Sequence, residues 1–379
     1  MATRIRYAEI VDRGVRIGFG SDERVVELPS RWLRDHGDDA GSSDPLTGQR
    51  TVDTFAILAD VEPVELAFGD GRLSLSWSDG ATTEHDAAAL ADLMENRRLP
   101  RPARRSRSIE IDPELDLWVG EAGPSAPIDI GELGDSEGMA EMLALLYRRG
   151  WVLIDGVAPG PAGVENLVGR FAYVRRTVFG GIWDLAPGLS DHLDSAYGTS
   201  DLDVHTDCTY SHDAPGLLMF SCQERDGDGG ESVLVDGFAA ARDLAAERPA
   251  LADVLTRFDL AGQYVEPGVH LRADRPALRL DANGRLAQVS FNNYDRAPVL
   301  PVDQWVETVI DAYGAFHELV SDPARQIRLG WKPGRVLMVD NWRLLHGRTA
   351  FTGTRGFLGC YVNHEDFESA LRVGGIIKD

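Results

Sequence analysis

Short runs in which apolar and polar residues alternate mark much of the chain, and this pattern is typical of β-strands with one buried face. Near the N-terminus the alternation predicts strands at 15–19, 23–28 and 73–77, the last followed by a turn at Ser78-Asp79-Gly80. Residues 87–96 are a candidate for a short helix. We therefore expect a small, β-rich N-terminal domain.

The rest of the chain combines further short strands with a few longer helices. Residues 136–149 place Met139, Met142, Leu143 and Leu146 on one helical face, and residues 150–156 then have the pattern of a strand. Further strands are predicted at 217–222, 232–235, 286–291, 336–339 and 357–362, with helices at about 239–247 and 303–320. Many short strands with long insertions are typical of a double-stranded β-helix, or jelly roll, which closes a small pocket between two sheets. The expected fold is mainly β with helical insertions.

The length of 379 residues exceeds one ordinary hydrophobic core, so two domains are expected. Residues 97–107 are rich in Arg and Pro within an otherwise acidic chain, which indicates a semi-rigid linker. The sequence thus predicts an N-terminal domain at 1–96, a linker at 97–127 and a jelly-roll domain at 128–379.

The net charge of −23 argues against general nucleic-acid binding, because phosphate would be repelled. No apolar run reaches the ~18 residues that span a bilayer. Residues 1–6 lack the apolar core of a signal peptide, so the expected location is cytoplasmic. The cysteines are few and scattered, which predicts neither a disulfide framework nor a Cys-rich zinc site; they are Cys208, Cys222 and Cys360.

A His-x-Asp pair formed by His205 and Asp207 is the candidate metal site. Positions i and i+2 of an extended strand face the same side, so the two side chains can converge on one ion. His346, far downstream, is the candidate third ligand, because two histidines and one carboxylate leave the opposite face of an octahedral iron open. The pair alone is a weak signal, since polar surface is its commoner explanation and further pairs begin at His36, His192 and His364.

Two more residues suit an anionic cosubstrate. Arg355 opens a strand shortly after His346, and a guanidinium can hold a carboxylate through two hydrogen bonds. An iron oxygenase that takes two electrons from 2-oxoglutarate needs a cation for the distal carboxylate of that cosubstrate. Ser232, in Gly229-Gly230-Glu231-Ser232, offers a hydroxyl to the same group.

Together these segments resemble the taurine-dioxygenase-like superfamily of Fe(II)/2-oxoglutarate oxygenases, and within it the gamma-butyrobetaine and trimethyllysine hydroxylases. The resemblance covers nearly the whole chain. It rests on His205-Thr206-Asp207, Gly230-Glu231-Ser232, Arg355, and the run Asp340-Asn341-Trp342-Arg343 that leads to His346-Gly347-Arg348. Trp32-Leu33-Arg34-Asp35 also resembles a motif of the family's N-terminal domain. The joint match is specific, whereas each segment alone is not.

The resemblance implies an aromatic cage for a trimethylammonium group. A quaternary ammonium donates no hydrogen bond, so aromatic faces are its natural partners, at ~0.5–2 kcal/mol each. Core packing is the commoner role of aromatic residues near strands, but four positions in register favour the cage. The matching positions are Phe179, Trp183, Tyr197 and Tyr361, with Phe179-Gly180-Gly181-Ile182-Trp183 similar to the family's aromatic-Gly-x-x-Trp stretch.

The metal pattern of the N-terminal domain departs from the family. Members often hold a structural zinc there through three Cys and one His, but residues 36–42 contain no Cys. We therefore expect no structural zinc, because such sites prefer Cys and His. The remote alternative is a zinc site made of His36, Asp38, Asp39 and His85.

At Asp194 the sequence differs from the substrate-binding pattern of the family that it resembles. The butyrobetaine hydroxylase has an Asn there that helps to place the substrate carboxylate, and two facing carboxylates repel. Asn292 matches another substrate-contacting position of the family, and Arg296 follows it closely. The departure favours a substrate with a second cationic or hydrogen-donating group.

The resemblance implies hydroxylation that depends on Fe(II), 2-oxoglutarate and O2, with ascorbate as a stimulant, in a homodimer. The first expectation is conversion of gamma-butyrobetaine to carnitine; the alternatives are trimethyllysine, a trimethylammonium phosphonate or a related amine. A jelly roll that binds quaternary ammonium without turnover is a rival, but it has no need of the triad and Arg355. A zinc hydrolase on the same triad is a second rival, and it leaves Arg355 and the cage unexplained. A metal site at His364 and Asp366 ranks below both.

Overall fold

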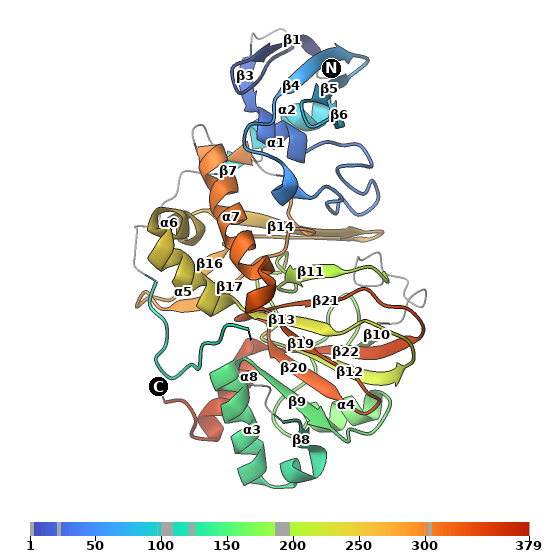
Figure 1. Cartoon of the computed structure of the whole chain (residues 1–379), viewed down its shortest axis with the longest axis vertical. Helices are drawn as coiled ribbons and strands as arrows, with labels where there is room; N and C mark the ends of the chain where they lie inside the picture. The colour runs from blue at the N-terminus through green and yellow to red at the C-terminus, as the bar shows by residue number, and fades with distance from the viewer. Residues whose placement is uncertain are drawn as a thin grey trace.

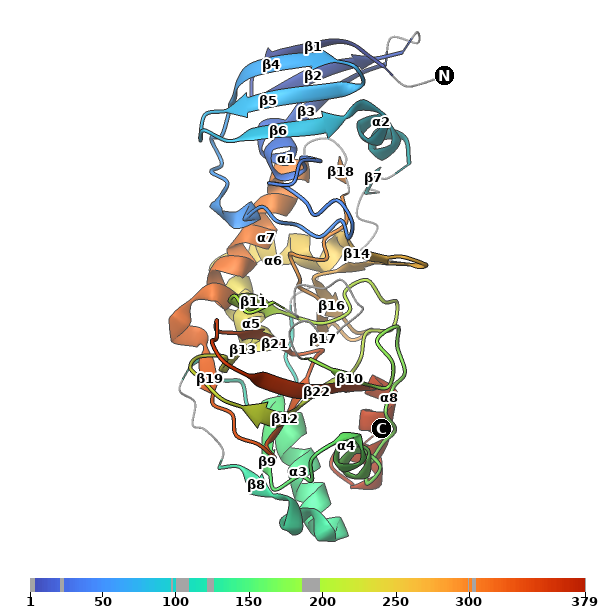
Figure 2. The ribbon, with the colours of Figure 1, turned by 90° about the vertical axis from the view of Figure 1, so that its right-hand side faces the viewer.

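The computed structural model describes residues 4–20, 24–96, 98–99, 109–120, 126–185, 198–298, 300–301 and 305–378. Two small sheets at the N-terminal end stand above a larger body made of two sheets and their covering helices (Figure 1). The same arrangement is visible after a quarter turn (Figure 2). The architecture is the mainly β fold that the alternating sequence pattern predicts.

The N-terminal part consists of two antiparallel three-stranded sheets and two short helices. Their shared core includes Ile17 and Leu75 from the inner faces of alternating strands, and Trp32 from the first helix. The predicted strands at 15–19 and 73–77 and the helix at 87–96 are confirmed, and the strand predicted at 23–28 corresponds to Arg24–Pro29. The elements are β1 (Ile5–Val11), β2 (Gly14–Phe19), β3 (Arg24–Pro29), α1 (Ser30–Asp35), β4 (Pro63–Gly69), β5 (Arg72–Trp77), β6 (Thr82–Asp86) and α2 (Ala87–Asn96).

The larger body contains the two sheets of a double-stranded β-helix. The six-stranded sheet has the order β10 (Ile182–Asp184), β22 (Arg355–Val362), β12 (Leu217–Arg225), β20 (Val336–Asp340), β9 (Trp151–Asp155) and β8 (Ile128–Asp129). The four-stranded sheet has the order β11 (Leu202–His205), β21 (Leu344–Arg348), β13 (Ser232–Asp236) and β19 (Ile327–Leu329). Strands adjacent in space come from distant parts of the sequence, as a jelly roll requires.

Helices cover the outer faces of both sheets. Helices α5 (Gly237–Glu247), α6 (Pro249–Arg257) and α7 (Trp305–Ser321) pack on the four-stranded sheet. Helices α3 (Ser136–Arg149), α4 (Pro161–Val168) and α8 (His364–Val373) pack on the six-stranded sheet. The helix α7 also reaches the N-terminal sheets, where Val306 joins their core (Figure 1).

The helix α3 shows how local sequence sets these elements. The Asp135 side chain accepts a hydrogen bond from the backbone N–H of Gly138 and caps the first turn. The helix ends at Gly150, whose φ of 83° is left-handed and suits a residue without Cβ. Its apolar face, which includes Met142 and Leu146, is buried against the six-stranded sheet. The predicted helix at 136–149 is therefore confirmed.

Other elements differ from the sequence prediction. The sequence did not predict α4, α6 and α8, nor the hairpin of β14 (Asp259–Glu266) and β15 (Val269–Pro276). The strand expected at 286–291 ends earlier, as β17 (Leu286–Val289), which pairs with β16 (Leu278–Leu280). It ends because the backbone of Phe291 bonds to Thr206 instead of a strand partner. The short β7 (Arg98–Leu99) pairs with β18 (Leu300–Pro301).

Part of the predicted linker packs on the larger body. Trp118 is buried, and its backbone N–H donates to the Asp236 carboxylate of β13. Most of the Arg/Pro-rich stretch at 97–107 lies outside the described residues. Among the described helices, none is long and apolar enough to cross a membrane. The boundaries at 1–96, 97–127 and 128–379, the cytoplasmic location and the homodimer stay predictions.

Candidate active site

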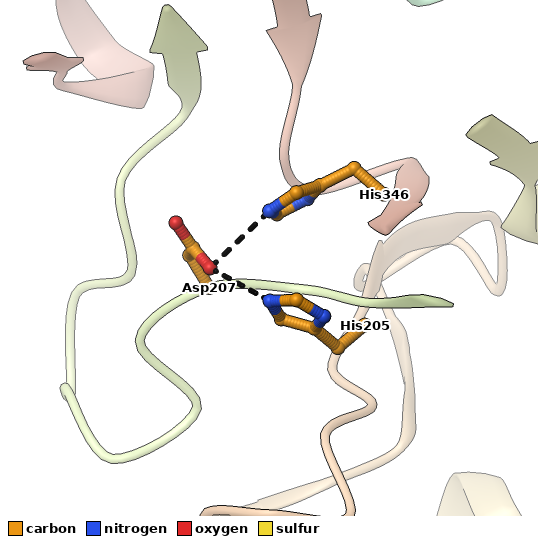
Figure 3. Close-up of side chains that lie close together, drawn as sticks. All are labelled: His205, Asp207 and His346. Carbon is orange, nitrogen blue, oxygen red and sulfur yellow. Dashed lines mark ion pairs between the residues drawn. The ribbon is translucent and has the colours of Figure 1, made fainter. Parts of the chain in front are cut away.

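Two histidines of the candidate triad are cross-strand neighbours in the four-stranded sheet. His205 is the last residue of β11, and the antiparallel register pairs it with His346 of β21. Asp207 lies just beyond the strand and turns back toward both rings (Figure 3). Its Oδ1 is 3.4 Å from the Nε2 of His205 and 3.4 Å from the Nε2 of His346. The donor atoms lie within 4.8 Å of one another, so one ion can contact all three.

Neighbouring groups orient two of the three ligands. The Nδ1 of His205 is 2.7 Å from the backbone carbonyl of Asp203, so this nitrogen carries the proton and Nε2 keeps its lone pair for a metal. The Asn341 side chain accepts from the backbone N–H of Asp207 at 2.8 Å and donates to the Asp207 carbonyl at 3.2 Å. Asn341 is fully buried. The backbone that presents the carboxylate is therefore clamped in one position.

The charges of the triad suit a divalent metal. Burial raises the pKa of Asp207, but the neighbouring His346 and His205 outweigh it and hold this pKa far below its usual range. Burial opposes the charged form of His205 too, yet the hydrogen bond and charge of Asp207 raise its pKa. Burial lowers the pKa of His346. An ionised carboxylate beside imidazole nitrogens is the donor set of non-haem iron sites.

The other His-x-Asp pairs that the structure describes do not form such a cluster. His36 is buried in the N-terminal domain and stacks on Trp32. His364 stacks on Trp342, with 3.6 Å between the ring centroids, and pairs with Glu368. His192 lies outside the described residues. Within the described part of the chain, the only group of three potential ligands is His205, Asp207 and His346.

A buried cation without an anion lies in the same cavity. Arg355, the first residue of β22, is 7% exposed, and no hydrogen bond or ion pair reaches its side chain among the described residues. The guanidinium lies 3.8 Å above the ring of Phe357. Burial, with the nearby charge of Arg348, lowers its pKa to about 9. Leaving a charge buried and unpaired is costly, so this geometry fits a site for a ligand carboxylate.

Two polar residues complete this end of the cavity. Ser232 of β13 is buried and lines the cavity, as the sequence predicts for a cosubstrate contact. Arg348 of β21 is opposite Ser232 in the sheet and also lines the cavity, a position that the sequence analysis did not assign. Its Nη2 donates to the carbonyls of Gly198 and Ser200 at 2.8 and 3.0 Å. This end of the cavity is therefore strongly positive.

Three of the four aromatic residues predicted for the cage gather at the other end of the cavity. The ring centroids of Phe179 and Trp183 are 6.1 Å apart, and those of Trp183 and Tyr361 are 4.5 Å apart. All three line the cavity, and the structure adds Tyr210, which sequence reasoning missed although it follows Asp207 closely. Tyr197 and Asp194 lie outside the described residues.

The strand β22 supplies both ends of the cavity. Alternation places Arg355, Gly359 and Tyr361 on one face of the strand. Gly359 pairs with Trp183 of β10, and a Cβ at this position would lie 2.6 Å from the Trp183 ring. The absence of a side chain at Gly359 therefore makes room for the Trp183 indole of the cage.

Asn292 lines the cavity, but its side chain also organises a turn. Its Nδ2 donates to Asp295 at 2.8 Å, and its Oδ1 accepts from the backbone N–H of Tyr294 at 2.9 Å. The structure adds Asp295 and Tyr294 to the cavity wall, neither of which the sequence analysis assigned. A direct contact between Asn292 and substrate stays a prediction.

The region where relatives place zinc is held by hydrogen bonds. The Asp39 carboxylate accepts from the Ser42 hydroxyl at 3.1 Å and from the backbone N–H of Glu84 at 3.2 Å. His85 is buried, with its Nε2 3.0 Å from the Thr83 hydroxyl. These contacts supply internal partners to the residues of the remote zinc alternative, and the absence of zinc stays a prediction.

Fold and site together define an oxygenase of the two-histidine, one-carboxylate class. The family described as "Taurine catabolism dioxygenase TauD, TfdA family" matches residues 114–361, and "Gamma-butyrobetaine hydroxylase-like, N-terminal" matches residues 8–90. The chain belongs to the TauD/TfdA family.

Three relatives align along nearly the whole chain. The mitochondrial trimethyllysine dioxygenase of Rattus norvegicus is 31% identical over 364 residues, covering 93% of this chain and 84% of the relative. The trimethyllysine dioxygenase of Meyerozyma guilliermondii is 32% identical over 359 residues, covering 90% and 89%. The gamma-butyrobetaine dioxygenase of Pseudomonas sp. (strain AK-1) is 28% identical over 361 residues, covering 93% and 92%.

These findings confirm the class of enzyme. The protein is an Fe(II)/2-oxoglutarate-dependent dioxygenase, and Fe(II) and 2-oxoglutarate are its cofactor and cosubstrate. The rival in which the jelly roll only binds its ligand, and the rival in which the triad serves a zinc hydrolase, are therefore set aside. The roles of individual residues rest on the geometry described above.

Replacing Tyr361 with Phe tests a link between cage and metal site. The Tyr361 hydroxyl donates to the Asp207 Oδ2 at 2.7 Å, so it holds the carboxylate oxygen that does not face the histidines. Phe keeps the aromatic face but loses this hydrogen bond, and loss of such an outer contact costs about 10–100-fold in metal affinity. We expect weaker Fe(II) binding in a chelator-competition assay, with near-normal substrate binding. Unchanged iron affinity would contradict the role of the hydroxyl.

Proposed function

We propose that the protein hydroxylates a small trimethylammonium compound, and that trimethyllysine is the substrate its site suits best. The observation that carries the proposal is the aromatic group of Phe179, Trp183 and Tyr361 beside the triad. A trimethylammonium group offers no hydrogen-bond donor and is held by ring faces. The names of the aligned relatives specify trimethyllysine and gamma-butyrobetaine, which both carry this group.

Different residues along the cavity would bind the metal, the cosubstrate and the substrate. His205, Asp207 and His346 would hold Fe(II), and Arg355 with Ser232 would bind the distal carboxylate of 2-oxoglutarate. The bound iron supplies activation of O2 coupled to oxidative decarboxylation of the cosubstrate. The cage fixes the cation and would aim a methylene of the substrate at the metal. The buried walls exclude bulk water from the reacting groups.

Acidic groups favour trimethyllysine over gamma-butyrobetaine. Asp295 is buried and lines the cavity, and the sequence has a second carboxylate at Asp194, the position that the family resemblance assigns to the far end of the substrate. Trimethyllysine carries an α-ammonium beside its carboxylate, and this cation complements such carboxylates, whereas the carboxylate of gamma-butyrobetaine has no adjacent cation and would be repelled. Gamma-butyrobetaine, the first expectation from sequence, therefore becomes the second candidate. A trimethylammonium phosphonate ranks lower for the same reason.

The test is succinate release from Fe(II)-loaded protein with 2-oxoglutarate, ascorbate and O2. Trimethyllysine, gamma-butyrobetaine, a trimethylammonium phosphonate and their dimethyl forms are compared, and hydroxylated product is identified by mass spectrometry. We expect the highest kcat/KM with trimethyllysine and a clear loss on removal of one methyl. Higher kcat/KM with gamma-butyrobetaine would reverse the ranking, and equal turnover of the dimethyl forms would remove the cage from the proposal.

Replacing Gly359 with Ala tests the cage by displacing Trp183, whose ring lies against Gly359. The added methyl would lie 2.6 Å from the Trp183 ring, so the indole must move. Since the ring forms part of the cage, we expect KM for the trimethylammonium substrate to rise about tenfold. The KM for 2-oxoglutarate serves as the internal control and should stay within about twofold. Equal rises in both would show general damage to β22 instead of a displaced indole.

A further inference from the structure

Residues 291–296, called here the 291–296 segment, form the cavity wall that faces the N-terminal domain. Asn292, Tyr294 and Asp295 all line the cavity. The Phe291 backbone bonds to Thr206, which lies between two ligands of the triad: its carbonyl accepts from the Thr206 N–H at 2.8 Å and its N–H donates to the Thr206 hydroxyl at 2.9 Å. The segment is thus attached directly to the part of the chain that carries the metal ligands.

The opposite side of the segment is attached to the N-terminal domain by a buried ion pair. The Nη2 of Arg296 donates to the Asp35 Oδ2 at 2.7 Å and to the Thr54 hydroxyl oxygen at 3.0 Å. The Thr54 hydroxyl donates to the Asp35 Oδ1 at 2.6 Å. The side chains of Arg296 and Asp35 are 12% and 2% exposed. The three side chains thus form a triangle of hydrogen bonds that fixes both carboxylate oxygens of Asp35, the last residue of α1.

Further contacts from the N-terminal domain flank this pair. The backbone N–H of Arg50 donates to the Tyr294 carbonyl at 3.2 Å, and its guanidinium donates to the Asp35 carbonyl. The Gln49 amide approaches the Asp295 carboxylate at 3.5 Å. Phe55 stacks near Phe291, with ring centroids 6.2 Å apart. The contacts of Arg50 N–H, Gln49 and Phe55 reach the 291–296 segment directly, and the Arg50 guanidinium holds Asp35.

The charge state of Asp35 agrees with this geometry. Burial raises the pKa of Asp35, but the charges of Arg296 and Arg50 outweigh burial and hold the pKa well below its usual range. A buried ion pair contributes little net stability, because desolvation offsets the attraction. In some proteins such a pair instead selects one arrangement among several. The pair of Asp35 with Arg296 is therefore better explained as a device that positions the 291–296 segment than as one that stabilises the contact between the two domains.

We propose that the N-terminal domain positions the substrate-facing wall of the active site, through the ion pair of Asp35 with Arg296. Asp35 is a positioning residue in this account and does not touch the substrate. The identity of the substrate used in the test rests on the proposed function, whereas the position of the wall can be measured independently of turnover.

A second ion pair between the same two parts of the chain provides a matched control. Arg31 of α1 pairs with Asp311 of α7 at 2.6 Å, with side-chain exposures of 12% and 53%. Neither residue lines the cavity. Replacing Asp311 with Asn therefore removes an Asp–Arg pair between the N-terminal domain and the larger body without touching the 291–296 segment. Effects of Asp35→Asn that Asp311→Asn lacks are specific to the wall.

The experiment compares Asp35→Asn, Asp311→Asn and the natural protein in two measurements. Hydrogen–deuterium exchange reports the mobility of the 291–296 segment in Fe(II)-loaded protein. Steady-state kinetics report KM for the trimethylammonium substrate, KM for 2-oxoglutarate, and succinate released per hydroxylated product. For Asp35→Asn we expect faster exchange in the segment, roughly a tenfold rise in substrate KM and more uncoupled succinate, with KM for 2-oxoglutarate nearly unchanged. For Asp311→Asn we expect none of these changes.

Each outcome decides the proposal. Unchanged exchange and substrate KM in Asp35→Asn would overturn it, as would equal changes in both variants. If Asp35→Asn does not fold, Thr54→Val removes one corner of the triangle at nearly constant volume and is judged by the same criteria. If the natural protein turns over no trimethylammonium compound, the proposed function is wrong, and the exchange measurement still decides whether the pair holds the wall.

Discussion

Replacing Asp207 with Ala is expected to abolish Fe(II) binding and to reduce turnover at least about 1000-fold, equivalent to about 4 kcal/mol of transition-state stabilisation. Asp207 supplies the only carboxylate of the triad, and its Oδ1 lies 3.4 Å from the Nε2 of each histidine. Without it, two imidazoles remain and no anionic ligand balances the charge of the ion. The measurements are iron content after dialysis and succinate release with 2-oxoglutarate and O2.

Asp203→Asn is the matched control for this substitution. Asp203 lies in β11, the strand that precedes Asp207; its side chain is exposed, and its backbone carbonyl, which meets His205, is retained. We expect near-normal iron content and turnover in this variant. Retained turnover in Asp207→Ala would remove Asp207 from the metal site. Restoration of wild-type activity by Zn(II) in place of Fe(II) would also contradict the iron assignment.

The parts of the fold that sequence predicted have strong local signals. The helix α3 begins after a capping Asp and ends at a left-handed Gly, so residues next to each end predict both boundaries. The start of β22 at Arg355 follows from a dense run of β-forming residues. The helix α8 was missed because it follows the last strand in a mostly charged stretch. The spacing of Phe367 and Leu371, which are both buried on one side of it, was the available signal.

Some parts of the candidate site could also be predicted from the sequence, whereas others could not. The His-x-Asp pair and the downstream His346 could be proposed from residue types and resemblance, yet β11 ends at His205, and Asp207 lies beyond it instead of within one continuous strand. Convergence therefore depends on the Asn341 clamp, which only the folded chain reveals. The pairing of Asp35 with Arg296 joins positions 261 residues apart, and no local pattern indicates it. Contacts of this kind follow from how the two parts of the chain pack.

Replacing Arg355 with Gln is expected to raise KM for 2-oxoglutarate about 100-fold, because truncating one partner of a buried charge pair costs about 3 kcal/mol. Gln keeps a hydrogen-bond donor but loses the cation and the paired N–H groups of the guanidinium. The exposed Arg328 on β19, at the edge of the four-stranded sheet, gives the control Arg328→Gln, in which KM should not change. Substrate KM at saturating 2-oxoglutarate should stay near the natural value in both variants, since the cage is untouched.

Replacing Arg355 with Met is expected to raise the stability of the cosubstrate-free protein and to weaken the binding of 2-oxoglutarate. Burial and Arg348 lower the pKa of Arg355 to about 9, so the folded protein holds this proton less tightly than the unfolded chain does, and at neutral pH the charge reduces stability. Met retains the contact with Phe357 without a buried charge. We therefore expect the cosubstrate-free variant to gain about 1 kcal/mol, or about 2 °C in Tm.

The same variant should lose the stabilisation that 2-oxoglutarate gives. In the natural protein a concentration of about 100 Kd adds about 2.7 kcal/mol, and the variant should show almost none of this shift. The two opposite changes follow from one cause, a buried cation to which no described residue offers an anion. A lower Tm for Arg355→Met together with an undiminished shift by 2-oxoglutarate would mean that the guanidinium serves packing, and that the distal carboxylate binds elsewhere.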